Sequence, residues 1–157
     1  QRQMCIRDSV LHYLEVLRDE VGFDEIKKKV VNPLKGKKIG AYYGCLLLRP
    51  GKIMAFDNPE NPTIMEDFIR ALGAEPVVYP YRNECCGGYI SLKEKEMAQN
   101  MCEKIMDSAK GFEADMLITA CPLCMYNLKK NGNGDLPVYY FTELLAEALG
   151  VKEEVAK

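Results

Sequence analysis

The stretch Asp115–Cys124, DMLITACPLC, gives the clearest indication of the fold of this chain. An apolar run of strand length ends at Ala120 and passes directly into two cysteines with the spacing Cys-x-x-Cys. Pro122 suits the first turn of a helix, because that position needs no backbone N–H donor. The stretch therefore predicts a buried β-strand, a tight connection and a helix, a unit from which parallel α/β sheets are built.

The same arrangement of a strand followed by cysteine occurs twice more. Residues 37–43 (KKIGAYY) predict a strand that ends just before Cys45, and residues 75–79 (EPVVY) predict a strand that leads toward Cys85 and Cys86. A fourth strand is expected at 136–140. Helices are expected at 10–31, 63–72, 91–110, 122–130 and 142–149, with capping boxes at Thr63–Glu66 and Ser91–Glu94 and a cap at Thr142.

The alternation of strands and helices predicts an α/β fold with a mostly parallel sheet flanked by helices. The carboxyl ends of parallel strands lie at one edge of a sheet, and ligand sites of open α/β sheets occur there. We therefore expect the three cysteine loops to meet at the C-terminal edge of the strands.

The chain divides into three expected regions. Residues 1–9 (QRQMCIRDS) show no periodicity and resemble a translated sequencing-adapter remnant, so they are expected to be non-native, and Cys5 is set aside. Residues 10–36 are expected to form an N-terminal helix and linker. Residues 37–157 are expected to form the cysteine-containing domain.

Composition limits the classes of protein that remain. A length of 157 residues suits one domain, and a hydrophobic content of 48% is enough for a real core. The formal net charge of −2 gives no electrostatic footprint for nucleic acid. Seven cysteines without a secretory signal or a long apolar run predict a reducing, cytoplasmic location and no membrane span.

Five cysteines have a spacing of C-x39-CC-x34-C-x2-C, and we call them the five spaced cysteines: Cys45, Cys85, Cys86, Cys121 and Cys124. Zinc usually takes four ligands, often from two Cys-x-x-Cys pairs, and only one such pair is present. A thiol–disulfide enzyme would explain Cys121 and Cys124 alone. Cysteines can also be buried packing residues, which is the interpretation we give Cys102 in the middle of a helix.

An iron–sulfur cluster accounts for the whole set, because thiolates are the usual ligands of such clusters. A fifth thiolate suggests a bridged or opened cluster. Gly87 and Gly88 would let the backbone approach inorganic sulfide closely. The free amides at the helix start after Cys121 would favour the negative charge of the cluster.

Other polar residues carry weaker signals. His12 is the only histidine and lies on the first predicted helix, so histidine general-base chemistry is not expected. Arg49, Arg82, Lys93 and Lys95 lie near the cysteines in sequence. They either steady an anionic substrate or are ordinary solvated side chains.

Around these cysteines the chain resembles the cysteine-rich CCG domain found in the B subunit of heterodisulfide reductase. The resemblance covers the chain from about Val10 to its end. It is carried by the stretches YYGCLLLRP (42–50), FDNPENPTIMEDFIRALGAEPV (56–77), ECCGGYISLKEKEMA (84–98), TACPLCMYNL (119–128) and PVYYFTELLAEALG (137–150).

The resemblance implies that the five spaced cysteines bind one noncubane [4Fe–4S] cluster and that Gly87 and Gly88 contribute to that site. The catalytic role would then be exercised by these cysteines through the bound cluster. It further implies a disulfide reductase whose best-known substrate, in methanogenesis, is the mixed disulfide of coenzyme M and coenzyme B. Partners would be a flavin-bearing A-type subunit and a ferredoxin-like C-type subunit.

The chain departs from the family in one respect. The full B-type subunit carries two such motifs, and the disulfide is cleaved between the two clusters, whereas this chain has one. We expect the first half to have been lost by truncation. The alternative is an iron–sulfur electron-transfer subunit paired with a hydroxy-acid or fumarate/succinate oxidoreductase, because related CCG domains occur there. A zinc-stabilised interaction domain is the third, non-enzymatic possibility.

Overall fold

The structure is a computed structural model that describes residues 10–151. Residues 1–9 and 152–157 lie outside the described part. The first of these ranges is the segment expected to be non-native, and it contains Cys5. The described residues form an α/β fold around one four-stranded sheet in which every pairing is parallel. The expected fold class is confirmed. The strands are β1 (Lys38–Tyr42), β2 (Glu75–Val77), β3 (Met116–Thr119) and β4 (Val138–Tyr140).

The strand order is β2-β1-β3-β4, so the three strands that precede the cysteines are adjacent. In the register of the central pair, Tyr42 lies beside Thr119 at the carboxyl end. The loops that carry Cys45 and Cys121 therefore leave the sheet side by side. β2 is the neighbour of β1 on the other side, which brings the third cysteine loop to the same edge.

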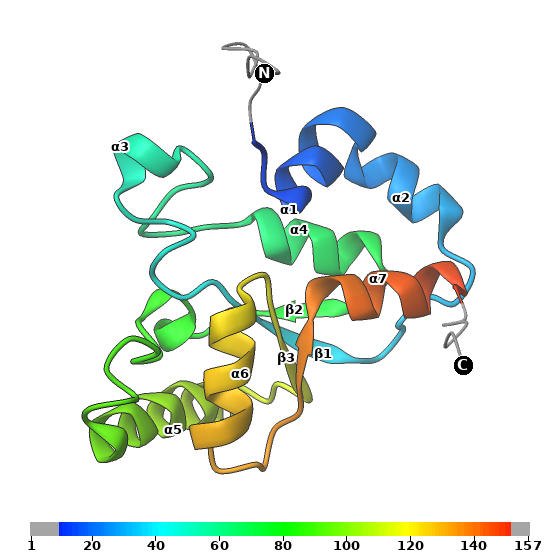
Figure 1. The fold of residues 1–157 in the computed structure, drawn as a ribbon. Coiled ribbons are helices and arrows are strands. Elements are labelled where there is room, and N and C mark those ends of the chain that lie inside the picture. The colour runs from blue at the N-terminus through cyan, green and yellow to red at the C-terminus, as the bar shows by residue number, and fades with distance from the viewer. Residues whose placement is uncertain (1–9, 152–157) are drawn as a thin grey trace, which may run out of the picture.

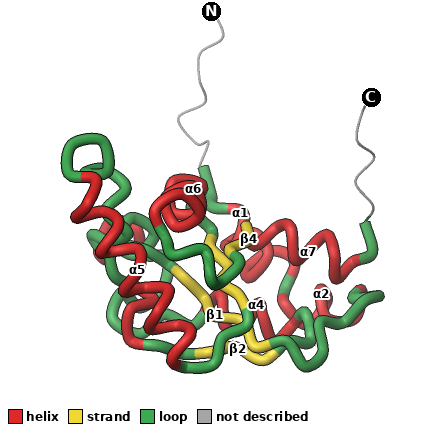
Figure 2. The backbone as a smooth tube through the Cα atoms, turned by 90° about the horizontal axis from the view of Figure 1, so that it is seen from below, coloured by secondary structure: helices red, strands yellow, loops and turns green. Residues whose placement is uncertain are grey.

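Helices cover both faces of the sheet (Figure 1). On one face lie α5 and α6, and on the other lie α4, α7 and the N-terminal helices; α5 and α7 are seen on opposite sides of the strands in Figure 2. The helices are α1 (Tyr13–Val16), the π-helix η1 (Leu17–Val21), α2 (Phe23–Lys29), α3 (Gly51–Met54), α4 (Ile64–Ala71), the 3-10 helix η2 (Pro80–Asn83), α5 (Lys95–Gly111), α6 (Pro122–Asn131) and α7 (Phe141–Leu149).

Each face of the sheet has its own core, because successive residues of a strand point to opposite sides. Ile39, Ala41 and Ile118 face α4, α7 and the N-terminal segment, where their partners are aliphatic and aromatic. Tyr42 and Leu117 face α5 and α6. We call the side of α4 and α7 the apolar face. We call the side of α5 and α6 the sulfur face, since its core also contains Cys86, Cys102, Cys124 and Met106.

Several local predictions were wrong in detail. The single helix expected over 10–31 is divided at Gly22, whose φ of 82° ends η1. Neither capping box forms, because α4 and α5 have no side-chain cap. Instead, one oxygen of Asp57 accepts the backbone N–H groups of Thr63 and Ile64 at 2.7 and 2.8 Å.

Two further local differences lie at loops and at the last helix. Residues 46–62, for which no helix was predicted, contain the one-turn helix α3. The cap of α7 is Tyr140 rather than the predicted Thr142.

Candidate functional site

The five spaced cysteines line one cavity at the carboxyl edge of the sheet. They come from the three loops that follow β1, β2 and β3, although up to 79 residues of chain separate the outermost thiols (Cys45 and Cys124). Cys86 and Cys124 are buried, and their sulfurs lie 3.8 Å apart. The sequence-based expectation that these three loops converge is therefore what the structure shows.

Backbone contacts tie the Cys45 loop to the loop of Cys85 and Cys86. The Tyr43 N–H donates to the carbonyl of Arg82 at 2.8 Å. The hydroxyl of the fully buried Tyr42 donates to the carbonyl of Glu84 at 2.8 Å. Because both acceptors lie just before the vicinal cysteines, these bonds fix the distance between the two loops.

The Cys121 loop is held by side chains from three other elements. The Cys121 N–H donates to the Thr119 hydroxyl oxygen at 3.3 Å. The carbonyl of Ala120 lies 3.0 Å from the Tyr140 hydroxyl and 3.3 Å from Nε2 of His12. Since His12 Nδ1 accepts the Leu14 N–H, its Nε2 carries the proton and donates. His12 is thus a structural residue, as its position in the sequence suggested.

Two glycines leave room for sulfur in this cavity. Gly44 has φ +66°, and a Cβ there would lie 2.9 Å from the sulfur of Cys124. A Cβ on Gly88 would lie 3.1 Å from Leu123 and 3.6 Å from the sulfur of Cys86. Gly88 lines the cavity as expected. A larger residue at either position would occupy the space in which the thiols lie.

Gly87 packs against α5. It does not line the cavity, and its Cβ position is filled from the side of α5, where Ala98 and Met101 lie 3.1 Å away. Its backbone N–H donates to the sulfur of Cys85 at 3.3 Å. Gly87 therefore turns the chain at φ +73° and supplies an amide donor to a thiol.

The thiols differ in acidity because they share hydrogen bonds. Hydrogen bonding with Cys124 lowers the pKa of Cys86 to about 6, with a smaller contribution from Asn127. Hydrogen bonding with Cys124 likewise lowers the pKa of Cys121 to about 6, aided by the backbone N–H groups at the start of α6. The pKa of Cys124 is raised by the same two bonds. Two sulfurs are thus readily available as thiolates, the form that binds metal.

The Cys45 thiol is half-buried. Burial raises its pKa to about 11, and the neighbouring Cys85 raises it further. Binding of a metal group would therefore have to displace the proton of Cys45, since ligands bind metal in the deprotonated form.

The donor set fits an iron–sulfur cluster in chemistry and in number. Five thiols, two of them acidic, surround the space, and an amide donor points at one sulfur. The enclosed volume is about 20 Å³, which is room for roughly one water molecule. Within residues 10–151, no three His, Cys, Asp or Glu side chains are grouped closely enough to hold one metal ion. A multi-atom cluster would therefore require the cysteine side chains, or the loops that carry them, to rearrange.

The charged residues named from the sequence do not reach this cavity. Arg82 is buried, with its guanidinium 3.3 Å from Glu66 and hydrogen-bonded to Asn61. Arg49 lies 3.6 Å from Glu60. Lys93 and Lys95 are exposed and do not line the thiol cavity. In the described structure, the walls beside the thiols are apolar and are supplied by Leu46, Tyr89 and Leu123.

Two polar contributors to the site were not foreseen from the sequence. Asn127 is 1% exposed and donates a hydrogen bond to the carbonyl of Cys86. Cys102 is fully buried, as predicted for a core residue, and its sulfur also lies 3.4 Å from that carbonyl. The available signal was the helical spacing of Asn127, which lies three residues after Cys124 and therefore on the same face of α6.

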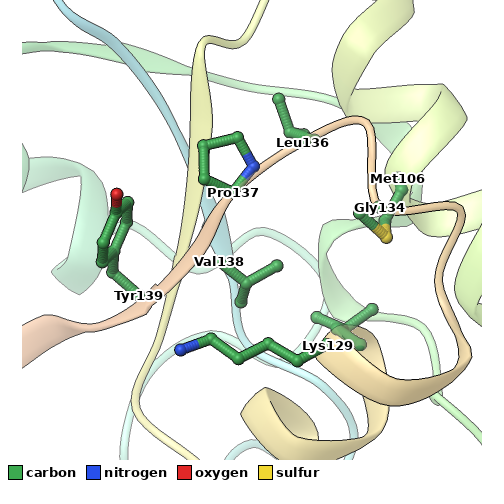
Figure 3. Close-up of a pocket in the computed structure, with 8 residues that line it drawn as sticks. Met106, Lys129, Gly134, Leu136, Pro137, Val138 and Tyr139 are labelled. Carbon is green, nitrogen blue, oxygen red and sulfur yellow. The ribbon is translucent and has the colours of Figure 1, made fainter.

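A larger hollow of about 300 Å³ lies against β4 (Figure 3). Met106, Val138 and Tyr139 supply much of its wall, and Lys129 brings the one charged group among its lining residues. None of the residues that line it is a cysteine. Its chemistry is therefore that of an open apolar groove rather than of a metal site.

Residues 39–129, more than half of the chain, match the CCG cysteine-rich domain. The chain belongs to this family. The matched range contains all five spaced cysteines, β2 and β3, and β1 except for its first residue.

Three relatives illustrate the range of this family. The chain is 34% identical to the 8-methylmenaquinol:fumarate reductase membrane anchor subunit of Wolinella succinogenes over 82% of this chain and 48% of the relative. It is 28% identical to the B subunit of the ferredoxin:CoB-CoM heterodisulfide reductase of Methanosarcina mazei (90% and 50%). It is also 28% identical to a protein of Archaeoglobus profundus described as like the heterodisulfide reductase B subunit (91% and 52%). The chain spans about half the length of these relatives.

No helix within residues 10–151 combines the length and the apolar character required to cross a bilayer.

Proposed function

We propose that the five spaced cysteines hold one iron–sulfur cluster, a [4Fe–4S] cluster of the noncubane type. We further propose that the chain is the cluster-bearing half of a disulfide reductase subunit of the heterodisulfide reductase B type. One observation carries the proposal: five thiols from three separate loops line a single cavity at the ligand-binding edge of a parallel sheet.

The donor set favours a cluster over structural zinc. A structural zinc site is closed by four ligands in a tetrahedron, so a fifth thiol at the same cavity would have no role. A thiol–disulfide pair would use Cys121 and Cys124 and leave three thiols unexplained. An iron–sulfur cluster offers several iron atoms, so that all five sulfur ligands can bind to one cluster.

The residues around the thiols have roles that follow from their positions. Cys86 and Cys124 would hold the buried side of the cluster, and Cys45, Cys85 and Cys121 the more open side. Leu46, Tyr89 and Leu123, exposed by 47%, 70% and 38%, form an apolar rim that would exclude water around a bound substrate. When bound, the cluster would supply one-electron redox chemistry.

The proposed reaction consumes two electrons and two protons for each disulfide. The sulfur–sulfur bond breaks and two thiols form, with protons from water and electrons from an iron–sulfur or flavin-bearing partner. The substrate class is a small mixed disulfide such as CoM-S-S-CoB, the pair named for the Methanosarcina relative. The proposed partners are A-type flavin and C-type ferredoxin-like subunits in the cytoplasm, and the proposed cluster domain comprises residues 37–157.

A second candidate is favoured by the relative from Wolinella succinogenes, which is 34% identical and named as a subunit of a methylmenaquinol:fumarate reductase. In that case the same cysteines would hold the cluster, and the chain would pass electrons between a quinol and a fumarate-reducing partner without cleaving a disulfide. The apolar rim would then face a quinol ring.

Anaerobic reconstitution of the chain with iron and sulfide tests the cluster. We expect about four irons and about four acid-labile sulfides per chain, with an electron paramagnetic resonance (EPR) spectrum distinct from that of a cubane cluster. Stoichiometric zinc with no labile sulfide would contradict the proposal.

The two candidates are separated by titration of the reduced, reconstituted protein. A small mixed disulfide should change the EPR spectrum under the first proposal, and a water-soluble naphthoquinone should leave it unchanged. The reverse pattern would support the quinol-linked electron-transfer function and exclude disulfide reduction by this chain.

A further inference from the structure

We propose that Asn127, together with Cys102, is a positioning residue that locks the Cys86–Gly87 peptide and so directs the vicinal thiols into the cavity. The inference rests on the proposed function only in naming Cys86 as a ligand. Asn127 lies on α6 and Cys102 lies on α5, and both are buried at the seam between these helices.

A closed set of hydrogen bonds surrounds the Cys86 carbonyl. The side-chain amide of Asn127 donates to that carbonyl, and it also lies 3.4 Å from the sulfur of Cys102. The sulfur of Cys102 lies 3.4 Å from the same carbonyl. An amide NH₂ has two protons and a thiol has one, so all three contacts can be made at once.

The orientation of the Asn127 amide is determined by its partners. The Cys86 carbonyl can only accept, so the NH₂ group must face it. On the opposite side, the Oδ1 atom of Asn127 accepts from the side-chain amide of Asn131. Asn131 lies one helical turn further along α6, and its hydrogen bond to Oδ1 fixes the Asn127 amide on the side away from Cys86.

A lock is needed at this position because adjacent side chains of an extended chain point in opposite directions. Here Cys85 and Cys86 line the same cavity, so the backbone between them departs from a regular extended strand. Gly87, which follows them, turns the chain at φ +73°. The carbonyl of Cys86 accepts from Asn127, and its sulfur lies 3.8 Å from that of Cys124, so both groups are directed toward α6.

The position of Asn127 also couples the two cysteine segments. Cys124 and Asn127 lie three residues apart on one face of α6, so the helix grips Cys86 at two points, its sulfur and its carbonyl. A shift of α6 would move both contacts together. The Asn127 bond is made to the backbone carbonyl, so it can hold the Cys86 backbone in place while the thiols bind a cluster.

Hydrogen exchange of the reduced, metal-free chain tests the lock without any cluster. In Asn127→Ala, backbone amides of the segment 84–91 should exchange about tenfold faster than in the wild type, the factor expected for one lost buried hydrogen bond. Leu128→Ala is the matched control, because Leu128 is equally buried on α6 and makes no hydrogen bond to Cys86. It should raise exchange in the segment 84–91 no more than in the rest of the described chain, because a cavity destabilises the fold as a whole.

The reconstituted protein provides the second readout. Asn127→Ala should shift the EPR line positions of the bound cluster, whereas Leu128→Ala should reproduce the wild-type spectrum. Equal exchange and equal spectra in Asn127→Ala and the wild type would overturn the proposal. Failure of any variant to bind iron would bear on the proposed function alone, since the exchange measurement does not depend on metal.

Variants of Cys102 decide the question if Asn127→Ala does not fold. Cys102→Ala removes the thiol donor and should accelerate exchange in the segment 84–91. Cys102→Ser restores a donor of similar size and should return exchange toward the wild-type rate. Identical rates in the two variants would show that Cys102 is only a packing residue and would remove it from the lock.

Discussion

The two faces of the central sheet are packed by different means. On the apolar face, Ile39, Ala41 and Ile118 meet Phe68 and Phe141 in a core that is closed by aliphatic and aromatic contact. On the sulfur face, the core contains three cysteines and borders the buried amide of Asn127, with hydrogen bonds directed to the site. The apolar face mainly stabilises the fold. The sulfur face also contains buried polar groups, and each of these needs a hydrogen-bond partner.

The two faces show how one fold supports two requirements. Buried apolar side chains tolerate exchange for others of similar volume, because their contacts are not directional. Thiols and amides at a ligand site need fixed directions, and a lost partner leaves a buried polar group unpaired. We therefore expect substitutions on the apolar face to change the free energy of unfolding and those on the sulfur face to change metal binding.

The largest expected effect lies on the sulfur face. The double variant Cys121→Ser/Cys124→Ser should bind almost no iron, compared with about four irons per chain in the wild type, because hydroxyls replace two thiolate ligands. Colorimetric iron analysis after anaerobic reconstitution measures this change. Cys102→Ser is the control and should retain its iron. Full iron content in the double variant would remove both residues from the site.

On the apolar face, Phe68→Ala should lower the free energy of unfolding by about 4 kcal/mol, since Phe68 is fully buried and its loss leaves a cavity. Urea denaturation measures this effect. Leu92→Ala serves as the control, because Leu92 is 98% exposed and its substitution should cost less than about 0.5 kcal/mol. A loss below about 1 kcal/mol for Phe68→Ala would show that this face is not the stabilising core.

A pair of glycines separates backbone strain from crowding at the cavity. Gly44 and Gly36 both have positive φ, but a Cβ on Gly44 meets Cys124 whereas one on Gly36 meets nothing. Gly36→Ala should cost about 1 kcal/mol of stability from strain, and Gly44→Ala should cost about 1 kcal/mol more and also reduce iron binding. Thermal unfolding and iron analysis measure the two effects. Equal costs with equal iron would mean that the Cys124 contact is unimportant.

The smallest expected effect concerns the buried carboxyl of Glu66, which accepts a hydrogen bond from the Tyr43 hydroxyl. Burial raises the pKa of Glu66 above its ordinary value, so folding favours the protonated form. The stabilisation is present below the pKa of the unfolded chain and is lost as pH rises through the folded-state pKa. Urea denaturation should therefore show wild type losing stability relative to Glu66→Gln as pH increases, and a constant difference would contradict this assignment.

Much of the architecture could be predicted from the sequence because strand-length apolar runs alternate with helical periodicity. The four strands and their parallel direction follow from that pattern. Because the cysteine loops come after the carboxyl ends of parallel strands, the meeting of the three loops follows as well. Of the six cysteines in the described chain, the spacing selects Cys45, Cys85, Cys86, Cys121 and Cys124, and these five line one cavity.

The remaining features depend on contacts between distant segments. The oxygen of Asp57 caps α4 from a loop, which no local capping motif signals. Gly87 follows the vicinal cysteines, yet only the position of α5 shows that it packs away from the cavity. Asn127 and Cys102 contact the Cys86 carbonyl across 41 and 16 residues of chain. Helix packing creates these contacts, and sequence periodicity does not encode them individually.

Protection of the thiols against alkylation tests whether all five hold a single cluster. The metal-free and reconstituted chains are treated with iodoacetamide, and tandem mass spectrometry reports labelling at each cysteine. Bound metal should suppress labelling at residues 45, 85, 86, 121 and 124 together, with iron and labile sulfide present at about four each. If one of the five labels equally fast in both states, or if protection requires only zinc, the five thiols do not share a cluster.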